Sequence, residues 1–275
     1  MKFGLDTLRQ SAQIMEVCAS SAEARTSWRE FQNKVEAFTC FSYSDEFRAD
    51  QVDAYQRLWL LEGRGYQQAE TALQGETAEH DLLPLHTGMG LAFACRTMQA
   101  AADISSKTGS FLELCNKHAL PGYQGACYEA LGLVARNLYP EGLFACEQSL
   151  PLEIREYFWH GVGRGLYFIP TNLIPVASAP WRAVQMALRE PPDQLSRLNA
   201  ISGLIWAVAL VNIRHPEVMD LFRFHHAGDL PASAFENGVR CALRVWDLAT
   251  RSSRPDGGPP GEWFRYVDDH VYTKH

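Results

Sequence analysis

Six polar side chains, each directly before a small residue, are the candidates for chemistry in this sequence. The polar residues are Glu62, Thr87, Glu129, His160, Ser202 and Asn237. If the small residues face the protein interior, these side chains lie at the border of that face, where buried charges must be paired or hydrogen-bonded. Converging, they would line a polar cavity. In the alternative, each polar side chain hydrogen-bonds to nearby backbone and fixes the register of the helices. This alternative is favoured, because buried polar groups usually have such partners.

Acid–base chemistry is the sharpest function that these residue types suggest. His86, Glu129 and His160 are the candidate catalytic residues, because histidine titrates near neutral pH and a nearby carboxylate can orient it. Arg164 and Glu62 are candidate ligand-binding residues, since a guanidinium can hold a carboxylate or phosphate through two hydrogen bonds. The structural alternative is a Glu–Arg or Glu–His pair inside a stack of helices.

Three aromatic residues complete the candidate ligand-binding set: Trp159, Tyr167 and Trp206. Core packing accounts for such side chains in most proteins. Their functional interpretation is an apolar wall for a hydrophobic ligand.

Other site chemistries lack their sequence signatures. The Cys115–His118 pair and the adjacent His225 and His226 have no second ligand pair at a zinc-site spacing. There is no GxSxG, HExxH or Walker loop, and residues 161–165 (GVGRG) follow no strand of the kind that a dinucleotide fold requires. We therefore expect no metal and no cofactor.

The small residues recur along the chain, and this recurrence predicts the elements that hold the polar side chains. They stand at positions 63, 88, 130, 161, 203 and 238, and alternate members are 67 to 77 residues apart. Each motif lies in a helix-compatible run, while alternating Val, Ile and Thr runs are nearly absent. The sequence predicts an all-α protein of stacked helix pairs with about six motif helices, forming either an open solenoid or a closed stack.

Small residues also occur in pairs four positions apart, on one face of each predicted helix. These pairs are Gly88/Ala92, Gly161/Gly165, Gly203/Ala207 and Gly238/Ala242. Glycine inside a helix costs ~1 kcal/mol relative to alanine. Close contact between helix backbones is the compensation that we expect.

Composition predicts the organisation of the chain. Its 275 residues are 47% hydrophobic with a net charge of -7, which is typical of a globular protein and argues against a nucleic-acid binder. We expect one helical repeat domain at 1–249, a linker at 250–261 (TRSSRPDGGPPG) and an aromatic docking tail at 262–275.

The cysteines and the apolar runs predict the compartment. Seven cysteines with no CxxC pair indicate reduced thiols, and residues 1–20 lack the apolar core of a secretion signal. The longest apolar run, Leu204–Val211, is far shorter than the ~20 residues of a membrane span. We expect a cytoplasmic protein without a membrane span.

Four segments, in this order, resemble the enediyne biosynthesis protein family, whose defining domain has no assigned function. They are residues 86–92 (HTGMGLA), 128–132 (YEALG), 161–168 (GVGRGLYF) and 202–207 (SGLIWA), with Ala130 and Ile205 where the family pattern has glycine. The resemblance covers roughly residues 60–245. It implies an all-helical protein that works beside a polyketide-like or other specialised-metabolite pathway, and it implies no catalytic residue.

Three functions are therefore open. The first is an accessory protein that binds a hydrophobic intermediate or a partner protein of such a pathway. The second is an enzyme that acts on the intermediate by His/Glu acid–base chemistry. The third is a structural subunit of a larger assembly. The sequence also allows a homodimer.

Overall fold

The computed structural model describes residues 21–46, 51–71, 73, 77–169, 172, 181–226 and 228–250. These residues form α-helices and short turns with no strand, which confirms the all-α prediction. Residues 1–20, the linker beyond Thr250 and the predicted tail at 262–275 lie outside the described residues.

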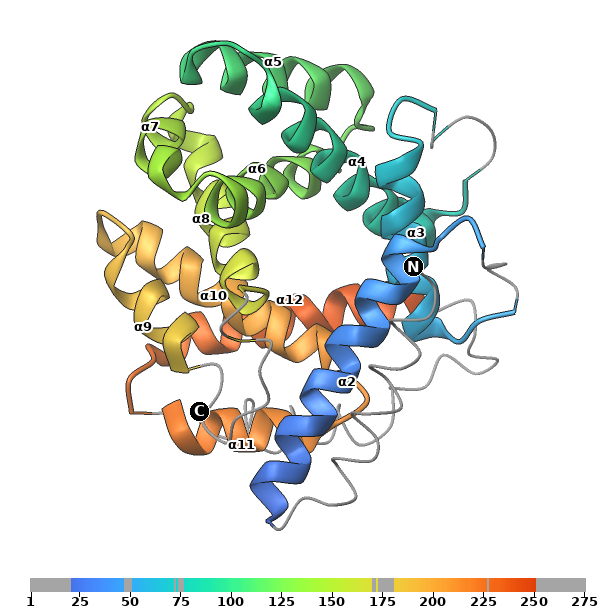
Figure 1. Ribbon diagram of the computed structural model, residues 1–275, viewed down its shortest axis with the longest axis vertical. Coiled ribbons are helices and arrows are strands. Elements are labelled where there is room, and N and C mark those ends of the chain that lie inside the picture. Colours follow the sequence, from blue (N-terminus) through green and yellow to red (C-terminus); the bar gives the residue numbers. More distant parts are fainter. Residues whose placement is uncertain are drawn as a thin grey trace.

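Six helices carry the small-residue motif. They are α3 (Ala54–Gln67), α4 (Glu79–Gln99), α6 (Gln124–Leu138), α8 (Leu152–Tyr167), α10 (Gln194–Val211) and α12 (Ala232–Thr250). Each packs against the next in chain order, and α12 also contacts α3 and α4. The six helices therefore surround a common interior (Figure 1).

The remaining helices lie mostly outside this ring. They are α2 (Ala22–Ser42), α5 (Ile104–His118), α7 (Leu143–Gln148), α9 (Trp181–Arg189) and α11 (Pro216–His226). Figure 1 shows α5, α7, α9 and α11 at the periphery, while α2 packs on α3 and α11. The equivalence of successive helix pairs, and with it the predicted repeat, stays a prediction.

Local sequence explains where several helices begin. Ser21, Asp53, Asp103 and Asp193 each precede a helix and accept a hydrogen bond from a backbone N–H in its first turn. Such a cap satisfies one of the N–H groups that the helix leaves unpaired at its start.

The helices of the ring touch through their glycines, as the sequence predicts. A β-carbon on Gly88 would lie 1.7 Å from the carbonyl oxygen of Glu62, and one on Gly203 would lie 1.9 Å from that of His160. Both positions are inside buried helical turns. Only glycine therefore allows these backbones to approach so closely.

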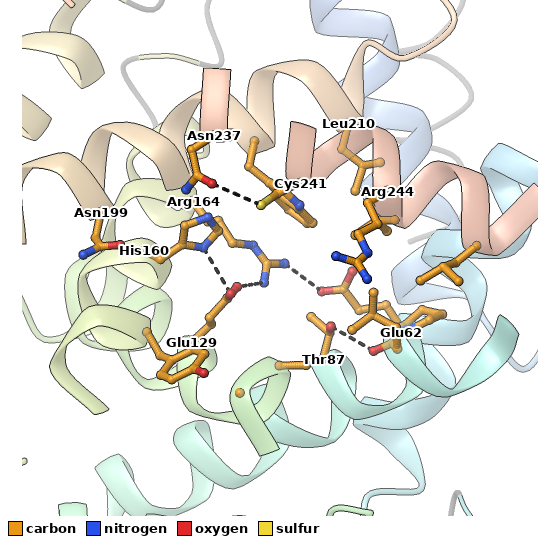
Figure 2. A pocket seen from close by; sticks show the side chains of 18 of the residues that line it. Glu62, Thr87, Glu129, His160, Arg164, Asn199, Leu210, Asn237, Cys241 and Arg244 are labelled. Atoms are coloured by element: carbon orange, nitrogen blue, oxygen red, sulfur yellow. Dashed lines mark hydrogen bonds and ion pairs between the residues drawn. The ribbon is translucent and has the colours of Figure 1, made fainter. Parts of the chain in front are cut away.

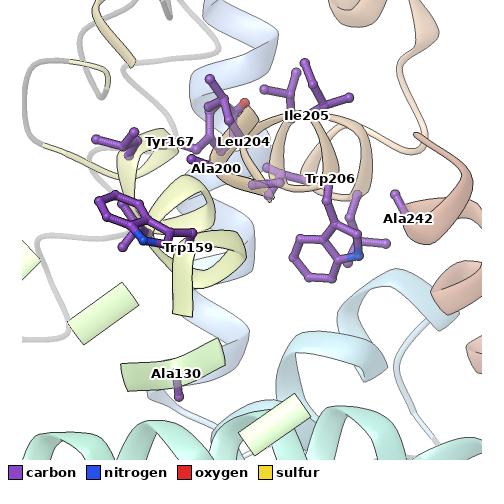
Figure 3. Packing of buried hydrophobic residues seen from close by; sticks show 14 of the residues in the cluster. Ala130, Trp159, Tyr167, Ala200, Leu204, Ile205, Trp206 and Ala242 are labelled. Carbon is purple, nitrogen blue, oxygen red and sulfur yellow. The ribbon is translucent and has the colours of Figure 1, made fainter. Parts of the chain in front are cut away.

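One hydrophobic cluster of buried side chains extends from Ala37 to Ala249. Helix α10 lies within it, between α8 and α12 (Figure 3). Within the described part of the chain, α10 alone is long and apolar enough to cross a membrane, but 72% of it is buried inside the protein. That burial is typical of a core helix, and no clear membrane span is present among the described helices.

A buried polar network attaches α2 to the ring. The Lys34 ammonium donates to Glu30 at 2.8 Å and to the carbonyl of Asn172 at 2.8 Å, and it lies 3.9 Å from the centre of the Tyr167 ring. The Tyr167 hydroxyl donates to Glu30 at 2.7 Å and accepts from Asn212 at 2.8 Å. These bonds satisfy groups that would otherwise be costly to bury.

Candidate functional site

A cavity of about 650 Å³ occupies the interior of the ring, and all six motif helices line it. Five of the six polar residues singled out from the sequence reach its surface: Glu62, Thr87, Glu129, His160 and Asn237 (Figure 2). They come from five different helices. In five of the six helices, the sequence motif therefore marks the position that presents a polar group to one shared space.

Ser202, the sixth polar residue, lies just behind the cavity wall. Its hydroxyl accepts a hydrogen bond from the Asn237 amide at 3.1 Å and donates to the carbonyl of Ala234 at 3.0 Å. It therefore supports Asn237 instead of facing a ligand.

Arg164 is the centre of the charged network in the cavity. Its guanidinium donates to Glu129 Oε2 at 2.9 Å, and its second terminal nitrogen lies 3.7 Å from Glu62 Oε1 (Figure 2). The same group lies 4.1 Å from the centre of the Trp206 ring, a cation–π contact. With only 4% of its side chain exposed, Arg164 is held in place on three sides.

His160 completes the network. Its Nδ1 atom lies 3.2 Å from Glu129 Oε1, so Glu129 contacts the histidine with one carboxylate oxygen and Arg164 with the other. Thirteen per cent of the His160 side chain is exposed. The ring is therefore oriented by a carboxylate while it still lines the cavity.

The two buried carboxylates have opposite electrostatic environments. Burial works against ionisation of Glu129, but His160 and Arg164 outweigh it and lower the pKa of the carboxyl to about 2. Burial raises the pKa of Glu62 to about 7, partly opposed by Arg164 and reinforced by the charge of Glu129. One carboxyl is thus firmly ionised, and its neighbour exchanges a proton near neutral pH.

His86 does not line the cavity with the other candidate catalytic residues. Its ring is completely buried and stacks on Tyr123. Nδ1 lies 2.6 Å from the carbonyl oxygen of Leu82, and Nε2 accepts from the backbone N–H of Leu120 at 2.9 Å. With both nitrogens occupied and its pKa lowered by burial, His86 fixes the segment before α6, and we leave it out of the site.

Of the three aromatic candidates, one lines the cavity and two lie in the hydrophobic core. Trp206 forms part of the cavity wall, whereas Trp159 and Tyr167 are completely buried and do not reach it. Figure 3 shows Trp159 and Tyr167 on α8, away from the Trp206 ring. The simpler interpretation, core packing, therefore describes these two.

Several cavity residues were not singled out from the sequence. Cys241 and Arg244 of α12 line it, one and two turns after Asn237 on the same helix face. Helical periodicity from Asn237 was the signal that could have found them. Glu153 and Glu156, at the start of α8, carried no motif that pointed to them. Tyr157 belongs to the aromatic run at 157–159 (YFW), which is visible in the sequence.

A metal site is not formed by the described residues, because no three His, Cys, Asp or Glu side chains among them gather as ligands. In the charged network, Arg164 stands between the two carboxylates. None of the six cysteines in the described ranges forms a disulfide.

Comparison of the chain with known protein families, curated proteins and solved structures gives no match. Fold and site therefore define the class to which the molecule can be assigned: an all-α protein with a ring of helices around a cavity lined by both polar and apolar side chains. The resemblance to the enediyne biosynthesis family stays a prediction.

Proposed function

We propose that the protein binds a small organic molecule in the cavity inside the helix ring. One observation supports this most: polar side chains from five helices converge on a space of about 650 Å³, a size typical of ligand pockets. If the polar network were purely structural, we would expect side chains to fill the space inside the helix ring. The cavity therefore favours the ligand-binding function over the scaffold alternative.

The walls suggest a ligand with an apolar body and one polar end. Leu58, Trp206, Leu210, Val245 and Leu248 supply apolar surface. The charged network of Arg164 and its partners supplies the polar end. Mixed walls of this kind bind the carbon skeleton by burial and set its orientation by a few hydrogen bonds.

A direct search for the ligand tests the proposal. The full chain is purified from its source and analysed by native mass spectrometry, with a Trp206→Ala variant and an exposed control variant, Phe224→Ala, in parallel. We expect a co-purifying small molecule on the wild type and the Phe224 variant, at reduced occupancy on the Trp206 variant. Equal occupancy in all three would place the ligand outside the cavity.

Acid–base catalysis on the bound molecule is the second candidate function. It is favoured by the two carboxyl pKa values, about 2 for Glu129 and about 7 for Glu62, because neighbouring groups with opposed pKa values commonly serve as a proton-exchanging pair. His160, held by Glu129, is the third group able to move a proton.

Turnover of the co-purified molecule separates catalysis from binding. It is incubated with wild type, with His160→Asn, and with Glu70→Gln, whose carboxylate pairs with Arg96 on the surface. An enzyme makes a new product that is lost only in the His160 variant. A binder returns the molecule unchanged in all three.

An accessory role in a specialised-metabolite pathway, a partner protein, a homodimer and a cytoplasmic location remain proposals from the sequence alone.

A further inference from the structure

We infer that the ligand of this cavity carries a positively charged nitrogen on an apolar body, and that the Glu62 carboxylate receives it. This inference rests on the proposed small-molecule function and adds the chemical class of the ligand.

The first argument is the unequal number of charges in the network. Glu62 and Glu129 provide two carboxylates, and Arg164 provides the one guanidinium that contacts both. That guanidinium hydrogen-bonds Glu129 at 2.9 Å but stays 3.7 Å from Glu62, beyond hydrogen-bond distance. Arg164 therefore compensates the charge of Glu129 more closely than the charge of Glu62.

The second argument is the position of Glu62 itself. The residue is 6% exposed and faces the cavity. Among the described residues, the partner of its carboxylate is the Arg164 guanidinium at 3.7 Å, which is an ion pair too long for a hydrogen bond. The neighbouring Thr87 hydroxyl donates to the carbonyl of Leu83 at 3.0 Å instead. A buried carboxylate without donors is unfavourable, so a donor supplied by a ligand would be strongly favoured. Burial raises the pKa of Glu62, and Arg164 opposes this shift only in part.

Arg244 is the charged group that could remove this deficit, but it does not. Although it lines the cavity from α12, it is exposed and forms no ion pair with Glu62 or with another described side chain. Two further carboxylates, Glu153 and Glu156, line the cavity from the first turns of α8. Apart from His160, which contacts Glu129, the charged lining residues are four carboxylates and two guanidiniums, a balance that attracts cations.

The third argument is the apolar surface near Glu62. Leu58 lies one turn before it on the same face of α3, and Leu210, Val245 and Leu248 line the cavity from α10 and α12. An ammonium at Glu62 therefore leaves an attached carbon skeleton against apolar walls.

Matched compounds test the inference. Three frameworks (an octyl chain, a naphthalene and an adamantane) are each used as an aminomethyl, a hydroxymethyl and a carboxylic acid compound, nine probes in all. Dissociation constants are measured by calorimetry at pH 7.5 on the full chain. The variants are Glu62→Gln, which keeps the size but not the charge, and Glu70→Gln as the surface control.

We expect at least one amine to bind wild type and the Glu70 variant about 10-fold more tightly than its matched alcohol, and the preference to fall below about 3-fold in Glu62→Gln. If alcohols or acids bind as tightly as amines, the inference is wrong while the proposed binding function stands. If the preference survives in Glu62→Gln, Glu62 is not the receiving group. If none of the nine binds, the inference is wrong, and the co-purification experiment decides the proposed function separately. Should Glu62→Gln not fold, the amine-to-alcohol ratio on wild type decides.

Discussion

A β-carbon on Gly161 would lie 1.8 Å from the carbonyl oxygen of Glu129. The backbone of Glu129 on α6 thus packs directly against α8 at Gly161. The side chain of Glu129 contacts His160 and Arg164, which lie on either side of Gly161 in the sequence of α8. One helix contact therefore sets both the packing and the charged network. Similar contacts join Gly88 to Glu62, Gly203 to His160 and Gly238 to Ser202, so the polar residue of one helix touches the small residue of the next.

Gly161→Ala should destabilise the protein by about 3 kcal/mol or more, because the new methyl group would force α8 away from α6. Gly109→Ala is the matched control in a helix, since nothing lies within 4 Å of its new β-carbon. That change should stabilise by about 0.5–1 kcal/mol. Urea unfolding of both variants checks the difference. Equal effects would contradict the close helix contact.

Stability should fall as pH rises from about 4.5 to about 7 because of Glu62. Its pKa is about 7 in the folded protein against an ordinary value of 4.5, so the folded state binds more protons in that window. The resulting loss in the free energy of unfolding is at most on the order of 3 kcal/mol. Glu62→Gln should flatten the profile between pH 5 and 8, whereas Glu70→Gln should retain it. The measurement is chemical denaturation at each pH.

Arg164→Met should destabilise the protein by about 3–5 kcal/mol at neutral pH, because it leaves Glu129 ionised in a buried site without its guanidinium. Arg96→Met is the control, as Arg96 and its partner Glu70 are 51% and 56% exposed. Its effect should be below about 1 kcal/mol. Thermal unfolding at one pH compares the two variants. An equally small loss for Arg164→Met would show that the network does not hold the helices together.

His86 should be neutral and protonated on Nδ1 at pH 7 and above. Nε2 must accept from the N–H of Leu120, which leaves Nδ1 as the donor to the carbonyl of Leu82, and burial lowers the pKa of the ring. Nitrogen-15 NMR of the imidazole distinguishes this tautomer from its alternative and from the charged ring. Detection of the charged ring at pH 7.5 would return His86 to the candidates for proton transfer.

Much of the scaffold follows from sequence patterns that are local. Helical periodicity and the near absence of strand signals predict the all-α class, and small residues four positions apart predict where the helices touch. The polar residue before each small one is also visible in the sequence. Adjacent positions on a helix differ by about 100°, so a polar side chain there borders the packed face.

The assignment of roles depended on the tertiary structure. His86 and His160 occur in similar motifs, yet one bonds two backbone groups and the other faces Glu129 in the cavity. Trp159 and Trp206 both lie on motif helices, but only Trp206 has the Arg164 guanidinium over its ring. Local sequence fixes which face of a helix a side chain occupies. The partner on that face comes from residues distant in the chain, and only the contact of α12 with α3 and α4 brings all six helices around one space.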